Sequence, residues 1–88
     1  MVTQNTDRWL TCQLDRGMFS DEMVVTYPPT GKPLSSEFIP ISFIHGNAGS
    51  LGKVRVAVVE KQGRSYALLP TPYGTIVHVQ PGDITDTP

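Results

Sequence analysis

The clearest hydrophobic pattern in the chain lies in residues 53–69, where two apolar runs rich in β-branched residues flank a short polar segment. Two such runs around a glycine-containing segment are typical of a β-hairpin. With Gln62 and Gly63 as the central turn residues, Gly63 takes a positive φ at little cost, and a type I′ turn requires the same of Gln62. This register predicts four cross-strand pairs: Glu60 with Ser65, Val59 with Tyr66, Val58 with Ala67, and Val56 with Leu69.

Alternation divides the side chains of this hairpin between two faces. One face is a continuous apolar slab made of Val54, Val56, Val58, Ala67 and Leu69. The opposite face is half apolar and consists of Arg55, Ala57, Val59, Tyr66 and Leu68. Because neither face suits bulk water, the hairpin requires cover on both sides. A small barrel or a contact between copies of the chain would provide that cover.

Four other segments have the pattern of strands. Residues 8–14 place Leu10, Cys12 and Leu14 on one face, and residues 23–27 are dense in β-forming side chains. Residues 36–44 read as one extended run, in which Pro40 predicts an edge strand or a bulge because proline donates no ladder hydrogen bond. Residues 75–79 form the last predicted strand, after which a turn at residues 81–83 lets Ile84 close one end of the fold.

Glycine and proline divide the chain into short pieces and thereby indicate an all-β fold. Eight of each occur in 88 residues, and no segment of ten or more without them has helical periodicity. We therefore predict a small antiparallel barrel of about five or six short strands, with a sandwich of two sheets as the alternative. Residues 8–84 form the single barrel domain, residues 1–7 a disordered N-terminal segment, and residues 85–88 a flexible tail. The succession of short strands along the chain, over about residues 8–84, is similar in outline to SH3-like and other small barrels, which implies a fold and no function.

Charge and targeting signals narrow the class of protein. Seven basic and eight acidic residues give a net charge of −1, so no global field attracts nucleic acid or anionic lipid. No apolar run approaches the roughly 20 residues of a membrane span, and the N-terminus lacks the basic start and apolar core of a signal peptide. We expect a soluble, cytoplasmic protein that does not bind membranes. A single cysteine excludes an internal disulfide framework.

Few residues in the sequence suggest catalysis. Cys12 paired with His45 or His78 is a conceivable nucleophile and base, but a lone cysteine in an apolar strand is more often a small buried hydrophobic residue. The cysteine and histidines show no zinc-ligand spacing. The glycine-rich segment 45–52 favours a flexible connection over an anion site, because it precedes a strand and no helix. We therefore expect a non-enzymatic protein with no metal and no cofactor.

Binding is the function class that remains. The half-apolar face of the hairpin predicts an interaction surface for a protein partner or for a second copy of the chain, and its predicted contacts are Arg55, Val59, Tyr66, Leu68 and Tyr73. An alternative is single-stranded nucleic acid, held by phosphate contacts and base stacking. That surface would consist of Lys53, Arg55, Lys61, Arg64 and Tyr66. The same charges are also typical of a strand edge protected from self-association.

Overall fold

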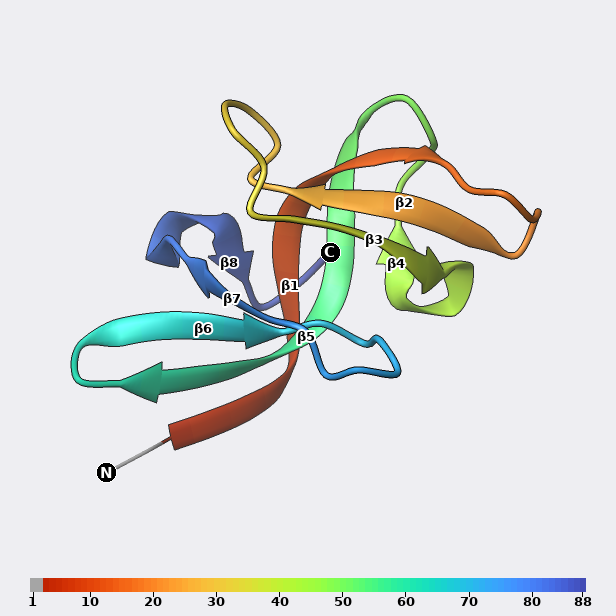
Figure 1. Ribbon diagram of the computed structural model, residues 1–88. Coiled ribbons are helices and arrows are strands. Elements are labelled where there is room, and N and C mark those ends of the chain that lie inside the picture. The colour runs from red at the N-terminus through yellow and green to blue at the C-terminus, as the bar shows by residue number, and fades with distance from the viewer. Residues whose placement is uncertain (1–2) are drawn as a thin grey trace.

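Antiparallel strands make up a nearly closed barrel in the computed structural model, which describes residues 3–88 (Figure 1). Six strands follow the order β3-β2-β1-β5-β6-β7, and two short strands pair at the sides, β4 with β5 and β8 with β1. No α-helix occurs in the described residues. The elements are β1 (Thr3–Arg16), β2 (Glu22–Tyr27), β3 (Ser35–Pro40), the 3-10 turn η1 (Ile41–Phe43), β4 (Ile44–His45), β5 (Leu51–Lys61), β6 (Arg64–Leu68), β7 (Ile76–Val79), the 3-10 turn η2 (Pro81–Asp83) and β8 (Ile84–Thr85).

The predicted hairpin is confirmed as β5 and β6. Its turn residues have positive φ, 54° at Gln62 and 75° at Gly63, as the type I′ prediction required. The ladder has the predicted register from Lys61–Arg64 to Ala57–Leu68. It ends one pair before Val56 and Leu69, and the N–H of Leu69 donates instead to the carbonyl of Thr75 at 2.8 Å.

Two predicted strands have different bounds in the structure. The first strand begins at Thr3 because its N-terminal part pairs with the end of β5, as in the Thr3–Glu60 and Asn5–Val58 pairs. The strand thus begins inside the segment 1–7 that was expected to be disordered, and residues 1 and 2 lie outside the described residues. The extended run predicted over 36–44 is broken after Pro40, where η1 turns the chain before β4. The edge position of β3 is confirmed, because it ends the strand path.

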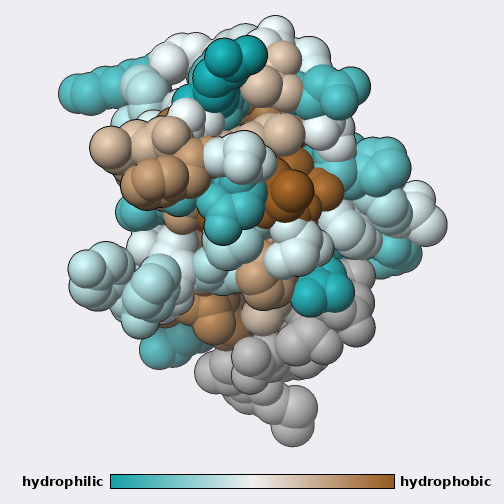
Figure 2. Space-filling model, turned by 90° about the vertical axis from the view of Figure 1, so that its right-hand side faces the viewer, coloured by the Kyte–Doolittle hydropathy of each residue, from teal (hydrophilic) through white to brown (hydrophobic). Residues whose placement is uncertain are grey.

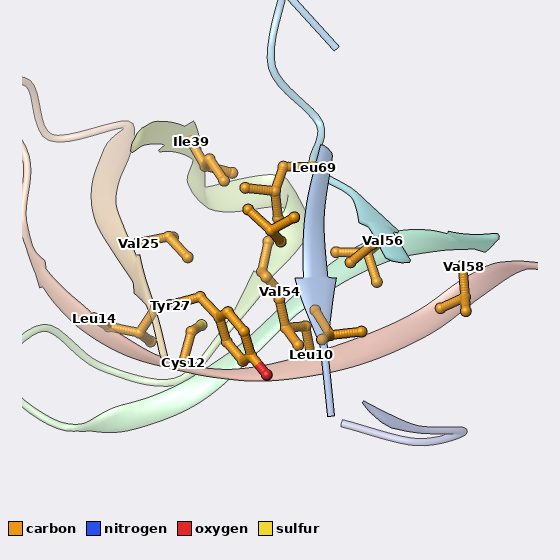
Figure 3. Packing of buried hydrophobic residues seen from close by; sticks show 13 residues of the cluster. Leu10, Cys12, Leu14, Val25, Tyr27, Ile39, Val54, Val56, Val58 and Leu69 are labelled. Carbon is orange, nitrogen blue, oxygen red and sulfur yellow. The ribbon is translucent and has the colours of Figure 1, made fainter. Parts of the chain in front are cut away.

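The inward faces of the strands form the core. The predicted apolar slab of the hairpin is buried, and so are Leu10, Cys12 and Leu14 of β1. Figure 3 shows labelled side chains from β1, β2, β3 and β5 converging on one interior. Ile84 is partly buried against this cluster and pairs with Leu10, in agreement with its predicted place at the end of the fold.

Side chains close the seam between the two ends of the strand path. No ladder joins β3 to β7 among the described residues. At one end of the seam the hydroxyl of Thr75 donates to the carboxylate of Glu37 at 3.3 Å. At the other end the hydroxyl of Tyr27 donates to Asp83 at 2.6 Å and accepts from the backbone N–H of Gln80 at 3.1 Å. The barrel is thus completed by side-chain hydrogen bonds where its backbone ladder stops.

Candidate interaction surface

The outward face of β5, β6 and β7 carries the apolar side chains that sequence reasoning placed there. Leu68 of β6 lies between Ala57 of β5 and Ile76 of β7 in one row of the sheet. Because solvent-facing rows of an antiparallel sheet are usually polar, an apolar row across three strands is unusual. Leu68 is half-buried, whereas Ile76 is 63% exposed. We call this row, together with the neighbouring Val59 and Tyr66, the outer face.

Tyr66 and Val59 occupy the next row of the outer face. They are cross-strand partners, and Tyr66 also pairs with His78, whose ring centroid lies 5.5 Å from that of the tyrosine. Both Val59 and Tyr66 are half-buried, and His78 is exposed. The position of His78 beside Tyr66 extends the outer face across β7.

An open apolar groove of about 290 Å³ adjoins this face. It lies where the pairing partner of β5 changes from β4 to β6. Leu68 lies in its lining, and the guanidinium of Arg55 lies 5.1 Å from the ring centroid of Phe43 at its rim. Cation–π contacts of this kind hold an arginine over an aromatic ring. The remaining lining residues are Val56, Ala57, Leu69 and Pro70. We refer to this feature as the groove.

The five predicted contact residues are therefore not equivalent. Val59, Tyr66 and Leu68 belong to the outer face, and Arg55 lies at the rim of the groove. Tyr73 is in the β6–β7 connection and is 91% exposed. This connection passes beside Leu68, because a methyl group built on Gly74 would lie 3.8 Å from the Cδ1 atom of that leucine.

Sequence reasoning missed Phe43, Pro70 and Ile76 as members of this surface. Phe43 lies in the run predicted as extended over 36–44, and only the turn η1 brings it to the groove. Pro70 lies outside every predicted strand. Ile76 was detectable, because alternation with the buried Val77 and Val79 places it on the outside of β7.

The residues predicted as nucleic-acid contacts form two separate groups: Lys53 and Arg55 lie early in β5, and Lys61, Arg64 and Tyr66 lie toward the hairpin turn. Lys53, Arg55 and Lys61 alternate along β5 and share one face, but Ala57 and Val59 lie between the first two and the third. The ammonium of Lys53 donates to the hydroxyls of Thr11 at 2.8 Å and Thr85 at 3.3 Å. Two further members of the predicted set, Arg64 opposite Lys61 and Tyr66 opposite Val59, lie on β6. Apolar side chains thus interrupt the predicted basic track.

Cys12 lies inside the barrel. Its side chain is fully buried, and burial raises the pKa of its thiol to about 12, which keeps it protonated at neutral pH. The thiol donates a weak 3.8 Å hydrogen bond to the carbonyl of Gly52. Its interpretation as a small buried hydrophobic residue is confirmed. Among the described side chains, those of residues 8–88, no cluster of three or more potential metal ligands occurs.

The β1–β2 turn carries a second group of exposed apolar side chains. On the side of the barrel that bears the β1–β2 turn, apolar patches are separated by polar side chains (Figure 2). Met18 and Phe19 in this turn are 76% and 67% exposed. A hollow of about 430 Å³ lies beside them, and Met23 and Ala48 are part of its lining. We call Met18 and Phe19 the tip.

Comparisons of this chain with protein-family models, with curated proteins and with solved structures find no match. Within the described residues, no helix has the length and apolar character needed to cross a membrane. The function is therefore argued from the surface of the barrel.

Proposed function

We propose that this chain is a non-enzymatic interaction module, which docks through the outer face and the groove on a protein partner or on a second copy of itself. The observation that carries the proposal is the row Ala57, Leu68 and Ile76 across three strands, beside a groove of about 290 Å³. Removing apolar surface from water is the dominant favourable term in most protein association. An apolar row that the barrel leaves outside supplies that driving force.

The geometry also favours a rigid contact. Val59, Tyr66 and Leu68 lie within strands whose backbone is fixed by ladders on both sides. Arg55 is held over Phe43 at the rim of the groove. Side chains that are already ordered lose little conformational entropy on binding, so such a surface binds without a large ordering cost.

Affinity capture from the native host, followed by identification of the bound proteins, tests the proposal when variants of the surface are compared. We expect the double variant Leu68→Ser/Ile76→Ser to lose the bound proteins or, in sedimentation, the self-association of the wild type. Leu34→Ser is the matched control, because Leu34 is 65% exposed and lies in the β2–β3 connection. A wild type that neither captures protein nor self-associates overturns the proposal, as does equal binding by all three proteins.

Binding of single-stranded nucleic acid is the alternative proposal. It is supported by the shared outward direction of Lys53, Arg55 and Lys61 on β5, where Lys61 lies two residues from Val59, the cross-strand partner of Tyr66. Its test is a titration of labelled single-stranded RNA and DNA at low and high salt. Binding that weakens steeply with salt and is lost in Lys61→Glu/Arg64→Glu supports it. Absent or salt-insensitive binding removes it.

A further inference from the structure

The tip is a rigid structure despite its apolar, exposed side chains. The carboxylate of Glu22 accepts hydrogen bonds from the backbone N–H groups of Met18 at 3.0 Å and Phe19 at 3.4 Å, and the N–H of Glu22 donates to the carbonyl of Phe19 at 3.3 Å. Gly17 allows this closure, because a Cβ atom there would lie 2.7 Å from Cγ of Glu22. The turn therefore presents two apolar side chains from a fixed backbone.

The groove has the size and chemistry to receive such a tip. Its volume of about 290 Å³ is at the lower end of the roughly 300–1,000 Å³ typical of ligand pockets, which suits one or two side chains. Its lining is mainly apolar, with Phe43, Leu68 and Pro70 among its members. Tip and groove come from different parts of the sequence, so each copy of the chain carries both halves of a possible contact.

The charges around the two features are complementary. The segment that bears the tip, residues 15–22, has three acidic side chains and one basic side chain, and its Asp21 is exposed. Of the described residues that line the groove, Arg55 alone is charged, and its charge is opposite to that of the tip segment. Opposite potentials steer two surfaces together and favour one orientation.

We infer that the occupant of the groove is the tip of a second copy of this chain, with Phe19 inserted beside Leu68 and the acidic turn facing Arg55. This inference rests on the proposed function and names its partner. Because tip and groove are different surfaces, the contact is heterologous: each molecule offers a tip to one neighbour and a groove to another. Such a contact produces chains or rings and does not stop at a two-fold dimer unless a ring closes there.

A mixing experiment tests this arrangement. Phe19→Asp places a negative charge in the tip and Arg55→Glu reverses the charge of the groove; both residues are exposed, so the fold is kept. Each variant alone should be monomeric in sedimentation at concentrations where the wild type associates. An equimolar mixture should form a one-to-one dimer and nothing larger, because the intact tip of the Arg55→Glu protein enters the intact groove of the Phe19→Asp protein.

Controls separate this result from other causes. Leu34→Asp changes a side chain of similar exposure away from both features, and Lys61→Glu reverses a charge elsewhere on the hairpin. Both should self-associate like the wild type, within about twofold, whereas Phe19→Asp should weaken association at least tenfold. Leu68→Lys provides a second groove variant, and circular dichroism verifies the fold of each protein. Amide shifts of labelled Phe19→Asp protein on addition of Arg55→Glu protein should centre on Ala57 and Leu68.

The outcomes distinguish this inference from the proposed function. A wild type that stays monomeric at every concentration overturns the inference, and so does a mixture that stays monomeric while the wild type associates. Self-association of Phe19→Asp alone, which a two-fold contact between outer faces would produce, overturns it as well. In each case the interaction module stands if Leu68→Ser/Ile76→Ser abolishes capture of a partner or self-association. Loss of association in Leu34→Asp equal to that in Phe19→Asp also overturns the inference.

Discussion

The hydroxyl of Tyr27, at the end of β2, donates a 2.6 Å hydrogen bond to the carboxylate of Asp83 in η2, across 56 residues of sequence. The same oxygen accepts a 3.1 Å hydrogen bond from the backbone N–H of Gln80. Burial of the phenol, together with its bond to Asp83, raises the pKa of Tyr27. These bonds hold one end of the seam, where β3 and β7 form no ladder within the described residues.

Tyr27→Phe should lower the free energy of unfolding at neutral pH by about 1–2 kcal/mol, because both bonds are lost and their partners remain unsatisfied. The folded-state pKa lies above the unfolded value of about 10, so the stability from the protonated phenol is present below that pH and is lost as the pH rises through the folded pKa. Urea unfolding at neutral and alkaline pH measures both effects. The control Tyr73→Phe, in an exposed side chain, should match the wild type. A variant as stable as the wild type would show that the seam does not depend on this hydroxyl.

Ionisation of Cys12 should produce a second loss of folding stability at alkaline pH. Its folded pKa of about 12 exceeds the unfolded value of about 8.5, so its contribution to stability is complete below about pH 8.5 and is lost as the pH rises toward 12. The stability of Cys12→Ala should therefore fall less steeply than that of the wild type over this interval in urea unfolding.

Burial also predicts the reactivity of this thiol. At slightly alkaline pH a thiol reagent should modify Cys12 only as fast as the barrel opens, with full reaction in urea, because the attacking species is the thiolate and the side chain is enclosed. Rapid modification of the folded protein would contradict the buried position.

Gly52 and Leu14 are in close contact across β5 and β1. A Cβ atom on Gly52 would lie 2.3 Å from Cδ1 of Leu14 and 2.8 Å from the carbonyl oxygen of His45. Gly52→Ala should therefore destabilise the barrel by about 1–3 kcal/mol through overpacking, measured by thermal or urea unfolding. Gly82→Ala is the matched control, since a Cβ atom there meets nothing within 4 Å. Equal stability of the two variants would contradict this packing.

Gln62 has a backbone φ of 54°, which residues other than glycine rarely adopt. Asparagine tolerates this region and, followed by glycine, is the preferred pair in a type I′ turn. Gln62→Asn should raise the free energy of unfolding by a few tenths to about 1 kcal/mol, and Gln62→Val should lower it by about 1 kcal/mol or more. Chemical denaturation checks both. Because the side chain is exposed, a stability order of valine above asparagine would show that this φ does not limit the turn.

Local pattern was sufficient for the central part of the fold. Alternation along residues 53–69 predicted the hairpin, its register and its buried face, because each depends on neighbours within one ribbon and on a turn that Gly63 permits. The same reasoning placed Leu10, Cys12 and Leu14 in the core. For the candidate surface, alternation identified the outward side chains of β5 and β6. The same alternation along β7 places Ile76 on the outside.

The sequence by itself therefore determined an all-β chain, the hairpin at its centre and the division of side chains between core and surface, since these follow from alternation and turn chemistry over a few residues. Only the tertiary structure decided how the barrel closes, where the extended run after Pro40 breaks, and that Phe43 meets Arg55 beside Leu68. The tip and the groove were likewise visible only there. Contacts between segments far apart in the sequence depend on how the whole sheet curls, and a pattern over a few residues does not determine that curvature.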